Sequence, residues 1–397
     1  MQKRPVLQPL ATALALILGT NAALSEAPPS PEVPTLQSPL AVIQAALGSG
    51  QNGQQPLLRA VASGNRAEVS RRLADGDHVD AVLAGVAGQP GVCAAGIAAA
   101  AGDMPMLKLL LRAGAAIDGP TGAQSPLAEA ALACRLDVAK LLIERGASAG
   151  VSRGQVKATP LLAACQGACP SIALLLITHG ADPHAATSVG VTPLMVAAWW
   201  GSTGCMRVLL QHEPDLLATD HAGHDGIYFA ALRHHADCLE LLLQAGADAN
   251  RATVRGWTAL MAAARNGCER CVRALLEHHA DSSAATPAGW TAMREAAHHC
   301  HADIARLLLE AHAAVHPGSG PRWPAFETAV KSICPGVMRA MIESVHDITA
   351  IRHHIKRAAD EVETQLQVAD LNENVRSRLE QSRDLLESAL NRVEGDD

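Results

Sequence analysis

The chain has 397 residues, of which 49% are hydrophobic and only 2% are aromatic, and its formal net charge is −7. A negative net charge gives no electrostatic footprint for nucleic acid, so nucleic-acid partners are excluded from the expected functions. A core with so few aromatic residues must be built from Ala, Leu, Val, Ile and Met, and this composition favours helices over strands.

The first 25 residues have the pattern of a secretory signal peptide. Lys3 and Arg4 give a positive start, an apolar stretch follows at 11–19, and Ala-Leu-Ser at 23–25 fits a cleavage site, so that the mature chain would begin near Glu26. The apolar stretch is too short to span a bilayer well, and the alternative is an uncleaved segment or a short anchor. We therefore expect a periplasmic or secreted protein without a membrane span in its mature form.

Residues 26–54 are rich in Pro, Gly, Ser and Gln, which predicts a linker. The stretch from Gly48 to Gly53 matches the G-x-G-x-x-G pattern of dinucleotide sites. Such a site needs a strand before the glycines and a long helix after them, whereas Gln-Gln-Pro follows here. The glycines are therefore interpreted as part of the linker, and no cofactor is expected.

A repeat organises the chain from residue 55 to residue 345. The triplet Thr-Pro-Leu at Thr159 recurs 33 residues later at Thr192, and related triplets begin at Thr258 and Thr291, which are again 33 residues apart. About twenty residues after each triplet comes a Leu-rich segment that ends in Gly-Ala-Asp or a variant of it. Each period therefore predicts a short Ala-rich helix followed by a Leu-rich helix.

The Leu-rich segments place leucine at spacings of three and four, as at Leu239, Leu242 and Leu243, which predicts one buried helix face. One repeat cannot bury that face alone, so the repeats are expected to stack.

These features resemble the ankyrin repeat, whose pattern is a Gly-x-Thr-Pro-Leu turn, an Ala-rich helix, a turn, a Leu-rich helix and a Gly-Ala-Asp exit. The stretches VGVTPLMVAAWWG at 189–201 and GWTALMAAARNG at 256–267 match it. The resemblance implies an all-α ankyrin-repeat solenoid of helix–turn–helix units with short β-turn tips. The expected units are roughly 55–80, 93–118, 125–150, 159–184, 192–217, 225–250, 258–283 and 291–316, with a degraded ninth unit as a cap at about 324–345.

Residues 346–397 differ from the array because apolar residues such as Ile351, Ile355 and Val362 recur amid dense charge. This pattern predicts one or two amphipathic helices, with a break near 372–374. Two arrangements stay open. The helices dock on the array as a cap, or they form a coiled coil that would make a homodimer.

The pair Cys268-Glu-Arg-Cys271 has three interpretations. A redox centre would need a buried strand before the pair. A zinc site would need two further ligands, for which the Cys/His-rich repeats at 225–301 offer candidates. The third interpretation is structural disulfides, which an exported protein would keep. We favour the third, and no metal ion is expected.

The repeat register places several cysteines in adjacent units. Equivalent atoms of neighbouring units lie about 10 Å apart, so only offset positions can bond. The expected pairs are Cys238–Cys268 and Cys271–Cys300, and Cys134 would bond to Cys165 or Cys169; the alternative is that the cysteines are reduced and packed as small hydrophobic residues. The disulfide candidates are Cys134, Cys165, Cys169, Cys205, Cys238, Cys268, Cys271 and Cys300.

The resemblance implies that a protein partner binds to the turn tips and to the concave face of the first helices. Tryptophans fall at both places, and exposed Trp and Tyr often carry interface energy. The alternative is that these side chains pack against neighbouring turns and contact nothing else. The expected partner-binding residues are Trp199, Trp200, Tyr228, Arg233, Trp257, Arg265, Trp290 and Arg294.

No Ser-His-Asp, paired-carboxylate or phosphate-loop arrangement stands out in the sequence, so no enzyme is expected. The sequence predicts a non-catalytic protein-interaction module or scaffold in an exported compartment. Two alternatives are kept: a metal-binding or redox protein that uses the repeats at 225–301, and a secreted effector that binds host proteins.

Overall fold

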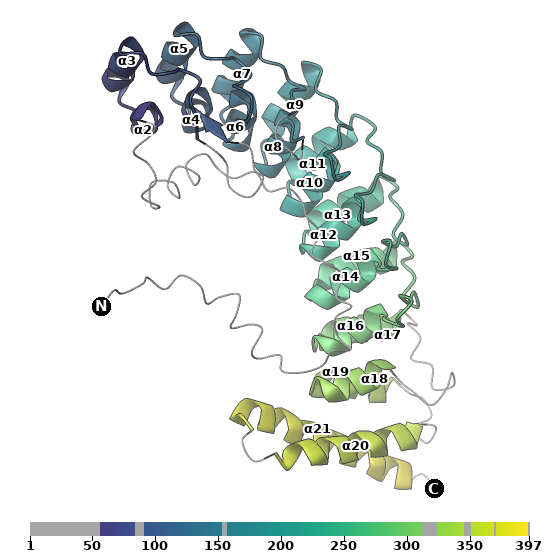
Figure 1. Ribbon diagram of the computed structural model, residues 1–397. Coiled ribbons are helices and arrows are strands. Elements are labelled where there is room, and N and C mark those ends of the chain that lie inside the picture. Colours follow the sequence, from purple (N-terminus) through teal and green to yellow (C-terminus); the bar gives the residue numbers. More distant parts are fainter. Residues whose placement is uncertain are drawn as a thin grey trace, which may run out of the picture. The chain divides into compact units, whose positions relative to one another are not determined.

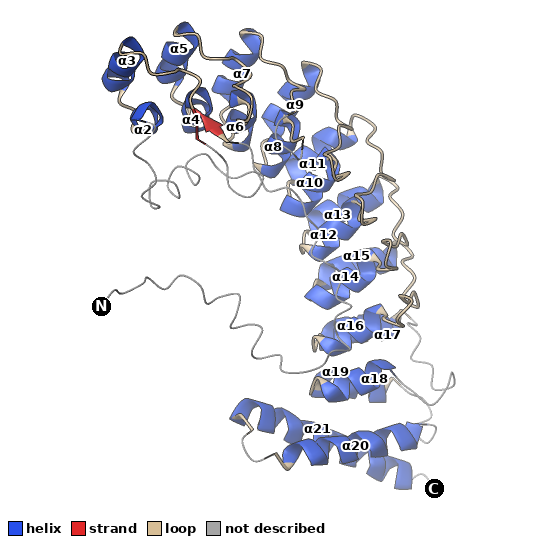
Figure 2. Cartoon of the chain, in the orientation of Figure 1, coloured by secondary structure: helices blue, strands red, loops and turns tan. Residues whose placement is uncertain are grey.

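The computed structural model describes residues 56–83, 91–152, 157–311, 324–344, 351–368 and 371–395. Within these ranges the chain is almost entirely helical (Figures 1 and 2). The one sheet found there is an antiparallel pair of short strands, β1 (Val82–Leu83) and β2 (Val92–Cys93). The predicted signal peptide and most of the predicted linker lie outside the described residues.

Successive helices form pairs, which we number units 1 to 9. The first helix of each unit packs on the first helix of the next, and second helices pack on second helices along most of the array. The predicted all-α solenoid of stacked units is therefore confirmed. The pairs are α2 (Pro56–Ala62) with α3 (Arg66–Ala74), α4 (Ala94–Ala101) with α5 (Met104–Arg112), α6 (Pro126–Leu132) with α7 (Leu136–Glu144), α8 (Pro160–Gln166) with α9 (Pro170–Thr178), α10 (Pro193–Trp200) with α11 (Thr203–Leu210), α12 (Gly226–Leu232) with α13 (Ala236–Gln244), α14 (Ala259–Asn266) with α15 (Glu269–Glu277), α16 (Ala292–His298) with α17 (Ala302–Glu310), and α18 (Pro324–Lys331) with α19 (Pro335–Glu343).

The threonine of each repeated triplet is the N-cap of a first helix. Thr159, Thr192, Thr258 and Thr291 have extended backbones, and each side-chain oxygen accepts a hydrogen bond from the amide three residues later, at 3.2–3.3 Å. Such a bond satisfies one of the free amides at a helix start. The triplet recurs because every unit must begin its first helix at the same place.

The core follows the predicted pattern. In α14, every residue from Ala259 to Ala264 is buried, and small side chains allow neighbouring first helices to approach closely. On the second helices, Leu239, Leu242 and Leu243 are 0%, 1% and 4% exposed, so the predicted leucine face is confirmed. Burial of this face between units is the main stabilising contribution to the stack.

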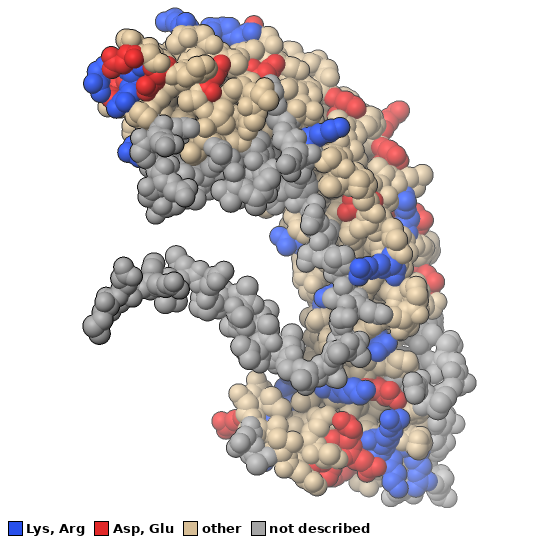
Figure 3. Space-filling model, in the orientation of Figure 1, with Lys and Arg blue, Asp and Glu red and all other residues tan. Residues whose placement is uncertain are grey.

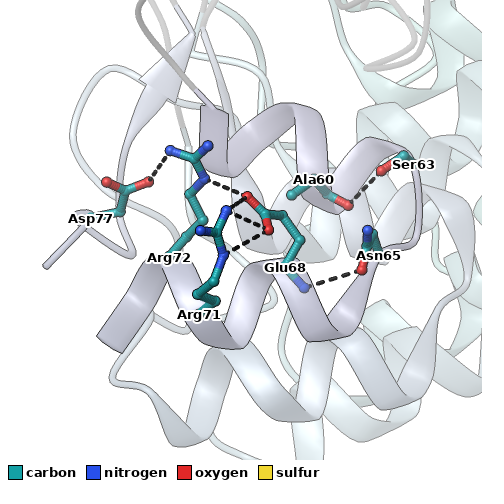
Figure 4. Close-up of polar contacts among 7 residues, drawn as sticks. All are labelled: Ala60, Ser63, Asn65, Glu68, Arg71, Arg72 and Asp77. Carbon is teal, nitrogen blue, oxygen red and sulfur yellow. Dashed lines mark hydrogen bonds and ion pairs between the residues drawn. The ribbon is translucent and has the colours of Figure 1, made fainter. Parts of the chain in front are cut away.

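Unit 1 carries a cluster of charged side chains (Figure 4). The Glu68 carboxylate accepts hydrogen bonds from Arg71 and Arg72, which lower its pKa to about 2, and Arg72 also lies 4.0 Å from Asp77. Asn65 caps α3 by accepting a bond from the Glu68 amide at 3.1 Å. Unit 1 is the first unit of the described array, and charged side chains suit a terminal repeat.

Two longer helices follow unit 9, namely α20 (Arg352–Leu366) and α21 (Glu373–Gly395). They pack on each other, and α20 contacts α18 while α21 contacts α19. Ile351, Ile355 and Val362 are fully buried, as the amphipathic pattern predicts, and charged side chains gather over both helices (Figure 3). The tail therefore lies against the last unit, and a homodimer through these helices stays a prediction. In the described ranges, no helix has the length and apolar character that crossing a bilayer requires.

Candidate protein-binding face

The structure buries three of the aromatic side chains that we expected to be exposed. Trp257, Trp290 and Tyr228 are only 3%, 9% and 2% exposed, so the prediction of exposure is wrong for them. In both turns the tryptophan backbone amide donates a hydrogen bond of 3.1 Å to a threonine hydroxyl. Trp257 donates to Thr253, and Trp290 donates to Thr286. These indoles therefore pack within the array, as in the second interpretation of the sequence, and are not open to a partner.

The predicted arginines and tryptophans nevertheless come together as pairs. The guanidinium carbon of Arg233 lies 4.6 Å from the ring centre of Trp199, that of Arg265 lies 5.9 Å from Trp257, and that of Arg294 lies 4.2 Å from Trp290. A cation over an indole face is attracted by the ring quadrupole. The structure thus forms three cation–indole pairs on units 5 to 8, and Arg233 of unit 6 reaches back across the interface to unit 5.

The side chains of these pairs differ in their exposure to solvent. Arg233 is exposed, whereas Arg265, Arg294 and Trp199 are half-buried. Trp199 also packs edge to face on Phe229, with ring centres 5.6 Å apart. We call Trp199, Trp200, Arg233, Arg265 and Arg294 the first-helix face, because each lies on a first helix or in the turn that ends it.

Two polar atoms near this face are buried without a partner. Neither the indole Nε1 of Trp200 nor the hydroxyl of Tyr228 has a hydrogen bond to the described part of the chain. Burial raises the pKa of the Tyr228 hydroxyl, so it stays protonated. Each unpaired group reduces stability, since a buried polar atom loses its bonds to water.

One acidic side chain that interacts with these arginines is buried. Glu295 on α16 is 2% exposed, and burial raises its pKa to about 7 although Arg265 and Arg294 oppose this. His299 Nε2 lies 3.7 Å from the Glu295 carboxylate, and the pKa of His299 falls to about 4 because of burial and of His298. The first-helix face therefore presents guanidinium groups and no exposed carboxylate of α12, α14 or α16.

The second helices carry a different charge pattern. Arg270 on α15 bonds to Asp237 at 2.8 Å and to Glu240 at 3.1 Å, both on α13, and Arg273 pairs with Glu269 within α15. These arginines already have carboxylate partners from their own chain. The arginines of the first-helix face thus lie on indole rings, whereas the arginines of α15 pair with carboxylates.

The buried acidic side chains of Glu295 and of its counterpart Glu129 on α6 were not expected from the sequence. Each lies four residues after its helix N-cap, where neighbouring units have Ala163, Val196 or Phe229. Glu129 is 3% exposed, and burial raises its pKa well above the ordinary value. The available signal was a charged residue at a repeat position that is otherwise apolar.

The cysteine pairing differs from most of the predictions. The structure joins Cys134 to Cys169 (one of the two pairings left open for Cys134), Cys268 to Cys271, and Cys300 to Cys334, with Cα–Cα distances of 5.4, 5.2 and 5.1 Å. The predicted pairs Cys238–Cys268 and Cys271–Cys300 are therefore wrong, and Cys334 was not among the candidates. The free cysteines of the described chain are Cys93, Cys165, Cys205 and Cys238, and all of them are buried.

One geometric rule explains the two disulfides between units. Cys134 and Cys300 occupy the turn between first and second helix with left-handed backbones, at φ 57° and 61°. Each reaches the N-cap of the second helix in the next unit, which is Cys169 or Cys334. Cys268 is also such an N-cap, but the facing turn residue is His234, so Cys268 bonds to Cys271 on the first turn of its own helix.

The described residues at 225–301 do not form the metal site that one alternative interpretation of the sequence requires. Across the parts of the chain that the structure describes, no three His, Cys, Asp or Glu side chains are grouped to hold a metal ion. The histidines near Glu295 make other contacts: His301 Nε2 lies 3.1 Å from the carbonyl of Arg265, and His298 Nδ1 lies 3.3 Å from the Ser332 hydroxyl.

Comparison with known proteins agrees with this architecture. The family model described as ankyrin repeats (3 copies) matches residues 149–220 and 227–317, which contain units 4 to 8 and the first-helix face. A search of curated proteins gave no match. The stacked helix pairs and the family match together show that this chain is an ankyrin repeat protein.

Proposed function

We propose that this protein is a non-catalytic interaction module of an exported compartment and that it binds a protein partner on the first-helix face. Ankyrin repeats support a protein–protein interaction in general. The observation that carries the proposed location is the presence of three cation–indole pairs, formed by Arg233, Arg265 and Arg294, on first helices or in the turns that end them.

These pairs suit binding for a physical reason. A guanidinium held on an indole loses less conformational freedom when it meets a ligand, and lower ordering cost raises affinity. Arginine also presents a planar set of donors that matches a carboxylate with two hydrogen bonds. A partner segment with carboxylate side chains and an apolar group for Trp199 therefore fits this surface best.

Replacing Arg233 and Arg265 together by alanine should weaken partner binding by tenfold or more, since two interface arginines each contribute on the order of 1 kcal/mol. The measurement is recovery of partners by the tagged, full-length protein from extracts of the exported fraction, quantified by mass spectrometry. The matched control is Arg270→Ala, which removes an arginine of the second helices. Equal recovery by the double variant, or equal loss with the control, would place the interface elsewhere.

The exported compartment is supported by the positive start, the apolar stretch and the small-residue site at 23–25. The disulfides fit an oxidising environment. We expect protein isolated without reductant from the exported fraction to have a mass that begins near Glu26. A mass that retains Met1, with the protein in the cytosol, would contradict export. A host protein among the recovered partners would favour the effector alternative.

A further inference from the structure

We infer that Cys165 and Cys205 form a further cross-link site, which joins unit 4 to unit 5 when it is oxidised. Cys165 lies near the end of α8 and Cys205 in the first turn of α11, and these two helices are in contact. Cys205 Sγ lies 3.5 Å from the carbonyl oxygen of Ala164, the residue that precedes Cys165. Both side chains are 0% exposed.

The repeat provides an internal comparison for this pair. Cys205 and Cys238 occupy the same position of successive second helices, and each thiol points to a first-helix carbonyl of the preceding unit, at Ala164 and Ala197. The residue after that carbonyl is Cys165 in unit 4 but Ala198 in unit 5. The residue that follows the contacted carbonyl therefore carries a second thiol for Cys205 but only a methyl group for Cys238.

The oxidation is a thiol–disulfide exchange with a disulfide of the exported compartment, such as a small-molecule disulfide. The Cys205 thiolate attacks one sulfur of that disulfide and releases the other as a thiol. Cys165 then loses its proton, attacks the mixed disulfide at Cys205 and releases the second thiol. Two thiols are oxidised and one external disulfide is reduced.

Burial decides when the exchange can occur. An external disulfide cannot reach either sulfur in the closed array, so exchange takes place before unit 5 docks on unit 4 or when that interface opens.

The cross-link would extend the covalent connection along the array. Cys134–Cys169 joins unit 3 to unit 4, and Cys165–Cys205 would join unit 4 to unit 5. Unit 5 carries Trp199 and Trp200 on α10, so oxidation would fasten the N-terminal end of the first-helix face. This inference does not depend on partner binding.

The test is to refold the full chain in a buffer of oxidised and reduced glutathione, block the remaining thiols in denaturant and map the peptides by mass spectrometry. We expect two blocked cysteines, Cys93 and Cys238, and one cross-linked peptide pair that contains Cys165 and Cys205. The inference is overturned if Cys165 and Cys205 are both blocked in molecules in which Cys134–Cys169 has formed.

Two variants keep the test specific. Cys165→Ala introduces the residue that unit 5 has at the equivalent position, so it should fold, and Cys205 should then be recovered either blocked or as its mixed disulfide with glutathione. Cys238→Ser should leave the cross-link intact. A peptide that joins Cys205 to another cysteine of the chain in the Cys165→Ala variant would overturn the assignment.

Discussion

Replacing Cys300 and Cys334 together by serine should lower the free energy of unfolding by about 4 kcal/mol. The two cysteines are 34 residues apart and join unit 8 to unit 9, so their bond restricts a long loop of the unfolded chain. Arg378 on α21 also donates to the Cys300 sulfur at 2.8 Å, so the last helix packs directly on this disulfide. We expect urea unfolding of the variant to begin at lower denaturant, with faster amide exchange in α18 to α21.

The control for this prediction is the double variant Cys268→Ser/Cys271→Ser. Its disulfide spans only three positions within one helix turn, so the same entropy argument gives a loss of about 2 kcal/mol. Exchange should then speed up around α15 and not at the C-terminal end. Equal losses in the two variants, or no loss for Cys300 and Cys334, would contradict the stabilising role of the bond between units.

Replacing Glu295 by glutamine should remove a pH-dependent loss of stability. Burial raises the pKa of Glu295 from 4.5 to about 7, so the folded chain keeps a proton that the unfolded chain releases. The contribution of the protonated group is complete below about pH 4.5 and is lost as the pH rises through about 7. Glutamine does not ionise, and the variant should therefore be more stable than the parent at pH 8 by about 3 kcal/mol.

The measurement is the free energy of urea unfolding of parent and variant at pH 4, 6 and 8. The difference between the two proteins should be small at pH 4 and should grow with pH, because other titrating groups are common to both. Glu277→Gln, at an exposed position of α15, is the matched control and should give no such trend. A constant difference between parent and Glu295→Gln at all three pH values would show that Glu295 ionises normally in the folded chain.

The sequence by itself determined the repeat, its period and the kind of helix in each half of a unit. These features are local: the Thr258 side chain caps a helix three residues away, and Leu239, Leu242 and Leu243 share a face because a helix has 3.6 residues per turn. The positions of the first-helix arginines and of the amphipathic tail also followed from the repeat register and from the spacing of apolar residues.

Only the tertiary structure decided which side chains meet across the interfaces between units. The contacts of Arg233 with Trp199, of Cys134 with Cys169 and of Cys300 with Cys334 join residues 34 or 35 positions apart. Their formation depends on the offset between stacked units, which a periodic sequence does not specify. The tertiary structure also buries Trp257, although its place in a turn suggested exposure.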